Sequence, residues 1–163
     1  MNDTQSDISL PDGSESPLPR KPFFHFWRSF WLTFLVASLA YAGYCFYVPS
    51  NDIAWADDYA SAQRQAARTG RPIILYFTGT WCVPCRIMKR QVWADEQVRA
   101  LVNAEFVPVA IDVDAPESAE LMTTYQVKGP PVTIVCNPKG TVVDWRAGGI
   151  SKTEFLELLD SSN

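Results

Sequence analysis

The sequence Trp-Cys-Val-Pro-Cys at residues 81–85 is the feature that most restricts what this chain can form. An apolar run typical of a buried strand precedes it at residues 73–77, and a helix-like pattern follows it from Ile87. If Cys82 begins that helix, unpaired backbone N–H groups and the positive end of the helix dipole face its sulfur. They lower the pKa of an accessible thiol from about 8.5 to roughly 7 or below. Cys85 then lies about one turn along the helix, within reach of a mixed disulfide on Cys82, so the spacing predicts a dithiol redox centre.

Other uses of a Cys-X-X-Cys pair fit this chain less well. Zinc requires four ligands, and the remaining candidates, Cys45, Cys136 and His25, stand in apolar segments without ligand spacing. A cysteine protease needs a histidine base, and no histidine follows His25. A purely structural disulfide stays open, although a loop this short adds little stability. We expect neither a metal ion nor another cofactor.

Length and charge limit the class of protein. The chain has 163 residues and a net charge of −4, with no basic stripe, which argues against nucleic acid as a partner. One domain with appendages fits this length. Four cysteines with one close pair do not form a disulfide scaffold.

The N-terminal part indicates a membrane anchor. Residues 1–22 are rich in Ser, Asp, Pro and Gly, which predicts a disordered tail. Residues 23–48 are apolar, and residues 29–48 carry no charge. As a helix, residues 29–48 would be about 30 Å long, the thickness of the hydrocarbon core of a bilayer. We therefore expect a transmembrane helix at residues 23–48 and a folded domain at residues 49–163.

The charges on either side predict how this span is oriented. Basic Arg20, Lys21 and Arg28 precede the uncharged run, and acidic Asp52 and Asp57 follow it. The positive-inside rule then places the N-terminus in the cytoplasm and the folded domain outside, in the periplasm of a bacterium.

A cleaved signal peptide is the competing interpretation of the same span. The sequence Ala-Tyr-Ala at residues 40–42 resembles a cleavage site. We favour a retained anchor because the apolar run continues beyond that site to Val48. Cys45 is then expected to be a small apolar residue of the span.

The pattern after the anchor predicts an α/β domain with a mixed sheet and helices on both faces. One helix is expected to start at Asn51 or Asp52 and to end at Gly70. Further helices are expected at residues 82–93, 95–102 and 117–125. Strands are expected at residues 73–77, 106–111 and 141–145. Within residues 127–136 a double proline feeds a further β-rich run, which a hairpin turn at residues 137–140 joins to the last strand. A capping box of Ser151 and Glu154 begins the last helix.

Three separated motifs give the chain a family resemblance. They are the Trp-Cys-x-Pro-Cys unit between strand and helix, Gly-Pro-Pro at residues 129–131, and Gly-Gly-Ile-Ser-Lys at residues 148–152. Together they resemble thioredoxin-fold proteins over about residues 55–159. The segment at residues 69–82 is similar to thioredoxin-like reductase domains outside the bacterial membrane, including the terminal domain of transmembrane electron carriers. The resemblance implies a thioredoxin-like mixed sheet and thiol–disulfide oxidoreductase activity.

The same resemblance implies roles for the residues of the first motif. Cys82 matches the nucleophile, Cys85 the resolving thiol, and Trp81 the aromatic residue beside the site. Tyr76 departs from the family, which carries a buried acid six residues before the nucleophile. Deprotonation of Cys85 must then rely on water, the substrate or another group. Cys136 is expected to be a core thiol.

The other two motifs imply a place for the substrate. Pro131 matches a cis-proline facing the dithiol, and Pro130 supplies the peptide group that pairs with an incoming client strand. Gly148 matches a loop that lets the client backbone approach closely.

The residues between the cysteines predict the direction of electron flow. Val83 and Pro84 offer no side-chain donor, and Pro84 lacks an N–H, so the thiolate is stabilised less and the dithiol is a better electron donor. We therefore expect a reductase of extracytoplasmic client disulfides. No Gly-x-Gly-x-x-Gly run occurs, so the expected electron source is a membrane thiol protein. The alternative is a non-catalytic, membrane-tethered thioredoxin-fold factor that binds clients or metal ions.

Overall fold

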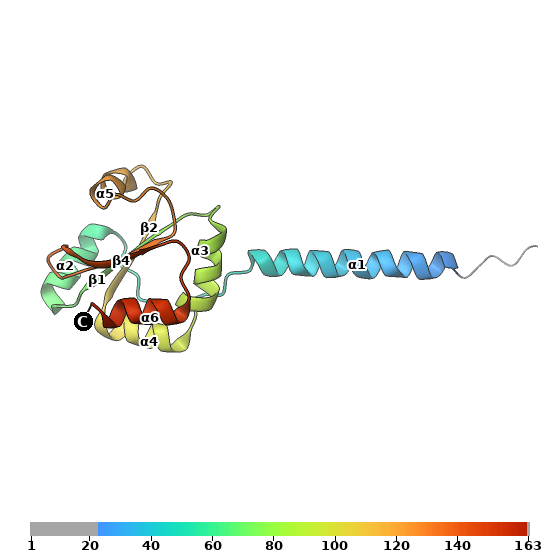
Figure 1. Ribbon diagram of the computed structural model, residues 1–163, viewed down its shortest axis with the longest axis horizontal. Coiled ribbons are helices and arrows are strands. Elements are labelled where there is room, and N and C mark those ends of the chain that lie inside the picture. The colour runs from blue at the N-terminus through green and yellow to red at the C-terminus, as the bar shows by residue number, and fades with distance from the viewer. Residues whose placement is uncertain (1–22, 163) are drawn as a thin grey trace, which may run out of the picture. The chain divides into compact units, whose positions relative to one another are not determined.

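The structure is a computed structural model that describes residues 23–162 (Figure 1). The tail predicted to be disordered, residues 1–22, lies outside these described residues. The chain divides into two compact units, the first ending at Cys45 and the second beginning at Phe46. In the first, helix α1 covers Phe23–Phe46, and its segment Phe26–Phe46 is long and apolar enough to cross a membrane. The predicted helix is therefore present, and it ends at Phe46 rather than at Val48.

The second unit contains a four-stranded mixed sheet with helices on both of its faces, as the sequence predicts (Figure 1). The strand order is β2-β1-β3-β4, with β1 parallel to β2 and antiparallel to β3, and β3 antiparallel to β4. The elements, in chain order, are α2 (Tyr59–Thr69), β1 (Ile73–Thr78), α3 (Val83–Met88), the π-helical turn η1 (Lys89–Trp93), α4 (Glu96–Glu105), β2 (Val107–Asp112), α5 (Ser118–Thr124), β3 (Val132–Cys136), β4 (Val142–Ala147) and α6 (Lys152–Asp160).

Strand β1 separates two apolar cores because successive side chains of a strand point to opposite faces. Ile74 and Tyr76 belong to the core that α3, η1, α4 and α6 cover. Leu75 and Phe77 belong to the core on the other face, with residues of α2 and α5. Every residue of β1 is buried, which explains its continuous apolar run.

The start of α2 differs from the sequence-based prediction. The helix begins at Tyr59 with Asp58 as its N-cap, not at Asn51 or Asp52. Asp52 instead pairs with Arg99 of α4 at 2.7 Å, and Ala56 forms a parallel bridge with Val109 of β2. Tertiary pairing with the sheet therefore overrides the local capping signal in this segment.

The predicted helix at residues 82–93 is present, but its second half is wound as the π-helical turn η1. This turn places Trp93, which is fully buried, against the rings of Trp55 and Phe155, each with centroids 4.8 Å away. Such turns are rare and occur often at functional sites. The capping box of Ser151 and Glu154 is confirmed at the start of α6.

Candidate active site

Cys82 and Cys85 form a disulfide at the start of α3, with their Cα atoms 5.2 Å apart. Cys82 is the N-cap of the helix, and its Sγ accepts a hydrogen bond from the backbone N–H of Cys85 at 3.2 Å. Pro84 stands in the first turn, where its missing N–H leaves no intrahelical bond unmade. The sulfur of Cys82 thus lies where backbone donors stabilise a thiolate.

The disulfide is less accessible than the sequence predicts. Cys82 is only 1% exposed, and Cys85 is fully buried. Their neighbours Trp81 and Val83 are 60% and 55% exposed. The expectation of an accessible sulfur is therefore wrong for the disulfide form, in which both cysteines are shielded from solvent.

Tyr76 lies behind the disulfide on the α3 side of the sheet. Its hydroxyl donates a long hydrogen bond of 3.4 Å to the carbonyl of Cys85, and its ring packs against Trp93 with centroids 5.0 Å apart. Burial raises the pKa of Tyr76 to about 12. The phenol therefore stays protonated at neutral pH and does not accept the proton of Cys85.

Trp81 is held by a residue that sequence reasoning missed. Its indole Nε1 donates to the carboxylate of Asp114 at 2.7 Å. Asp114 follows β2, whose last residue, Asp112, pairs with Thr78 at the end of β1. Since β1 and β2 are parallel, their carboxyl ends meet at one edge of the sheet, which is the signal that could have identified Asp114.

The Gly-Pro-Pro motif and the Gly-Gly-Ile-Ser-Lys motif meet beside the dithiol turn. The Pro130–Pro131 peptide bond is cis, as the family resemblance implies. The Pro131 carbonyl accepts a hydrogen bond from the N–H of Gly148 at 2.8 Å, and Gly148 has a positive φ of 88°. A Cβ on Gly149 would lie 3.3 Å from the Cβ of Pro84. These contacts link the loop after β4 to both the cis-proline and the first turn of α3.

Cys136 and Cys45 lie away from this arrangement. Cys136 is buried in the core that α2 and α5 cover, and burial raises its pKa to about 11. Cys45 belongs to α1 and is a free thiol. Residues 23–162 contain no group of three or more His, Cys, Asp or Glu side chains that could hold a metal ion.

Comparisons with known proteins agree with this geometry. The family described as "Thioredoxin-like domain" matches residues 59–163. A "Thiol:disulfide interchange protein DsbD" from Ralstonia nicotianae is 34% identical over 100 residues, which cover 60% of this chain and 16% of that relative. This chain therefore matches only a small part of the length of that relative.

Two solved structures show the same fold. A thioredoxin from Thermus thermophilus superposes with a TM-score of 0.61 and 32% identity, covering 66% of this chain and 85% of that one. The oxidised C-terminal domain of DsbD from Neisseria meningitidis has a TM-score of 0.56 and 22% identity, covering 64% of this chain and 91% of that one.

Proposed function

Because this chain belongs to the thioredoxin-like family, we propose that it is a thiol–disulfide oxidoreductase that reduces disulfides of client proteins through Cys82 and Cys85. The observation that carries the proposal is the disulfide at the N-cap of α3, where the Sγ of Cys82 accepts the N–H of Cys85 at 3.2 Å. A donor at this position favours the thiolate, which is the nucleophile in disulfide exchange.

The reaction proceeds in two exchanges. In the first, the Cys82 thiolate attacks a client disulfide, forming a mixed disulfide and releasing one client thiolate. In the second, Cys85 loses its proton to water or to the released client thiolate, because Tyr76 remains protonated. The Cys85 thiolate then attacks the Cys82 sulfur, the second client thiolate leaves, and the Cys82–Cys85 disulfide forms. Two electrons have passed to the client.

Reduction of the client is the favoured direction. Val83 and Pro84 place no side-chain donor beside the sulfur of Cys82, so the reduced form receives little extra stabilisation. A dithiol of this kind gives up electrons more readily than one with a histidine at that position. A membrane thiol protein is the proposed source of the two electrons that restore the dithiol.

The client is proposed to lie along the loops that meet beside the disulfide. Pro130 would pair with its backbone, Trp81 would flank its cysteine, and Gly148 would allow its main chain to come close. The hydrogen bond between Gly148 and Pro131, and the close approach of Gly149 to Pro84 that leaves little room for a Cβ, support this placement.

The proposed location is the inner membrane. The apolar segment Phe26–Phe46 would act as a single-pass anchor, and the basic residues before it would keep the N-terminus in the cytoplasm. The thioredoxin-like domain would then face the periplasm, where disulfides of exported proteins persist.

Trapping tests the mechanism. In the full chain expressed in membranes, Cys85→Ala should accumulate mixed disulfides with clients, because Cys82 can attack but nothing resolves the product. The adducts should vanish on reduction and should be absent from the double variant Cys82→Ala/Cys85→Ala. A Cys85→Ala chain that forms no more adducts than the double variant would overturn the mechanism.

Turnover separates this enzyme from a tethered binding factor of the same fold. With dithiothreitol as reductant, the full chain in detergent should reduce insulin, and Cys82→Ala should remove that activity. A binding factor would show no turnover, and the loss of Cys82 would change nothing.

A further inference from the structure

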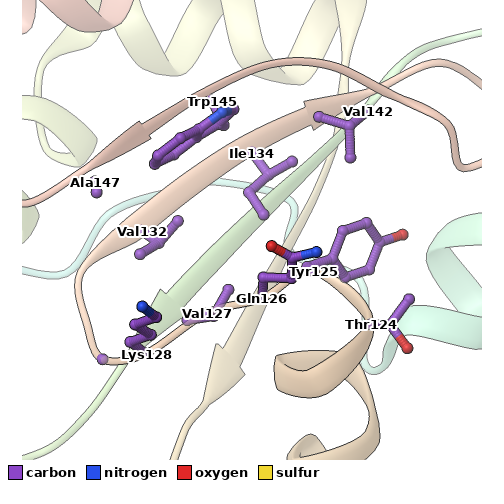
Figure 2. A pocket seen from close by; sticks show the side chains of 11 residues that line it. Thr124, Tyr125, Gln126, Val127, Lys128, Val132, Ile134, Val142, Trp145 and Ala147 are labelled. Carbon is purple, nitrogen blue, oxygen red and sulfur yellow. The ribbon is translucent and has the colours of Figure 1, made fainter.

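A groove of about 540 Å³ lies beside β4, on the face of the sheet that α2 and α5 cover (Figure 2). Val132 and Ile134 of β3 form its floor. Figure 2 shows Trp145 of β4 on one side of these two residues, and Gln126 on the other. The groove is separate from the disulfide, and the reaction described above does not use it.

The wall that β4 contributes is unusually apolar for the edge of a sheet. Within the described residues, β4 pairs with β3 alone. Its groove-lining side chains Val142 and Trp145 are 43% and 56% exposed. Edge strands normally carry charged or blocking residues that prevent contact with other chains. An exposed tryptophan beside an apolar floor is instead typical of a surface that binds a partner.

The opposite rim of the groove is the turn that ends α5. Gln126 has φ of 54°, and it is the one non-glycine residue with positive φ among residues 23–162. The adjacent Val127 donates its N–H to the carbonyl of Met122 at 2.8 Å, which fixes the turn after α5. The N–H of Gln126 also donates to the carbonyl of Thr123 at 3.2 Å, so these residues form a common left-handed ending of a helix, which holds this rim of the groove in place.

The charge of the groove has one sign. Lys128 is the only charged residue in the lining, and no ion-pair partner for it occurs among the described residues. Asp144 and Arg146, the charged residues of β4, pair with each other at 2.7 Å. Asp144 also accepts a hydrogen bond from Ser161 after α6, so this pair lies on the other face of the sheet. An occupant with a carboxylate would therefore complement the groove.

The groove begins where the proposed client site ends. Gly129 and Val132, which flank the cis-proline pair, both line it. Ala147 lines it as well, and the next residue, Gly148, donates to the carbonyl of Pro131 at 2.8 Å. A client strand that pairs at Pro130 therefore needs only a few more extended residues to enter the groove.

We propose that this groove binds a segment of the client polypeptide adjacent to its disulfide: an extended apolar segment with an acidic residue that pairs with Lys128. Trp145 and Ile134 take its apolar side chains. This inference rests on the proposed reductase function, and it adds a rule for which clients are reduced fastest.

Two synthetic peptides test the rule. Each contains the same intramolecular disulfide followed by an extended apolar segment, which carries glutamate residues in one peptide and lysine residues in the other. The measured quantity is kcat/KM for reduction by the full chain in detergent, expressed as the ratio of acidic to basic peptide. The ratio should exceed one for the wild type and fall by roughly tenfold in Lys128→Glu, because an attraction becomes a repulsion.

Two further variants complete the test. Lys139→Glu makes the same charge change on the exposed hairpin turn outside the groove and should leave the ratio at its wild-type value. Trp145→Ala should lower kcat/KM for the acidic peptide by roughly tenfold. An unchanged ratio in Lys128→Glu, or an equal change in Lys139→Glu, would overturn the inference. So would a Trp145→Ala variant that alters only self-association, since the occupant would then be a second copy of the chain. A wild type that reduces neither peptide would instead refute the proposed function itself.

Discussion

Cys82 and Cys136 are equally buried, at 1% and 0% exposed, yet their surroundings differ. Cys82 caps a helix, and its sulfur accepts the N–H of Cys85 at 3.2 Å. Cys136 lies on β3 among apolar side chains, and burial raises its pKa to about 11. Burial alone therefore does not predict whether a thiol reacts. We expect the direction in which nearby backbone groups point to decide it, because donors stabilise a thiolate and apolar side chains do not.

The two faces of the sheet also differ in the side chains that surround each sulfur. Behind Cys85 lie Tyr76 and Trp93, whose rings pack together and whose polar atoms remain inside the core. Around Cys136 the core contains mostly small and branched side chains together with the ring of Phe77, and Tyr125 is the polar neighbour of the thiol. One core thus lies behind the candidate dithiol site, and the other encloses the thiol of Cys136.

The largest expected difference between the two sulfurs is in activity. Cys82→Ser should reduce insulin turnover by the full chain to the uncatalysed rate, because a hydroxyl does not replace a thiolate as nucleophile. Cys136→Ala should keep the wild-type rate, since no step uses that thiol. Loss of turnover in Cys136→Ala, with the fold intact by circular dichroism, would break the comparison.

Removing one aromatic ring from each face of the sheet should sharpen the comparison of the two faces. Trp93→Ala and Phe77→Ala each delete a fully buried ring and should lower the free energy of unfolding by about 3–5 kcal/mol, measured with urea. Only Trp93→Ala should also shift the reduction potential of the Cys82–Cys85 pair, because Trp93 packs on the tyrosine that bonds to Cys85. Equal shifts in both variants would show that the two faces do not act separately.

Raising the pH should titrate the thiol of Cys136. Its pKa rises from 9.0 to about 11 on folding, so between these values the folded chain binds more protons than the unfolded chain. The stability that the protonated thiol contributes is fully present below pH 9.0 and is lost as the pH rises to about 11. The total loss of unfolding free energy is about 2–3 kcal/mol. With the disulfide intact, Cys136→Ala should lose less stability than the wild type over this range. Parallel urea midpoints for the two proteins would contradict the prediction.

The smallest expected effects come from the helix caps, one on each face. Asp58 caps α2 and Ser151 caps α6, both in capping boxes. Asp58→Ala and Ser151→Ala should each cost about 1 kcal/mol of unfolding free energy. Neither should change the rate of insulin reduction, because neither residue contacts the disulfide. A rate that follows stability in both variants would mean that activity depends on global unfolding.

Most of the fold could be predicted because the signals are local. The continuous apolar run of β1, Gly70 at the end of α2 and the capping box at Ser151 each act through neighbouring residues. The start of α2 could not be predicted, since the bridge between Ala56 and Val109 joins distant parts of the chain. The π-helical turn of η1 also depends on how Trp93 packs in the core, which no local pattern indicates.

The candidate site also has features that local sequence signals predict and features that depend on tertiary packing. The pairing of Cys82 with Cys85 could be predicted because the spacing alone brings the two sulfurs together. The burial of the two sulfurs could not be predicted. The hydrogen bond from Trp81 to Asp114 could not be predicted either, because it depends on how β1 pairs with β2. The groove beside β4 was missed because its floor and walls come from three separate segments.

The pH dependence of thiol alkylation tests the central claim most directly. The reduced full chain is treated with iodoacetamide over a range of pH, and mass spectrometry of each cysteine peptide gives its rate. Cys82 should reach half of its maximal rate clearly below the value for a free thiol, about 8.5, and Cys136 should do so only near 11. A Cys82 profile that coincides with a free thiol, or with that of Cys136, would contradict the account.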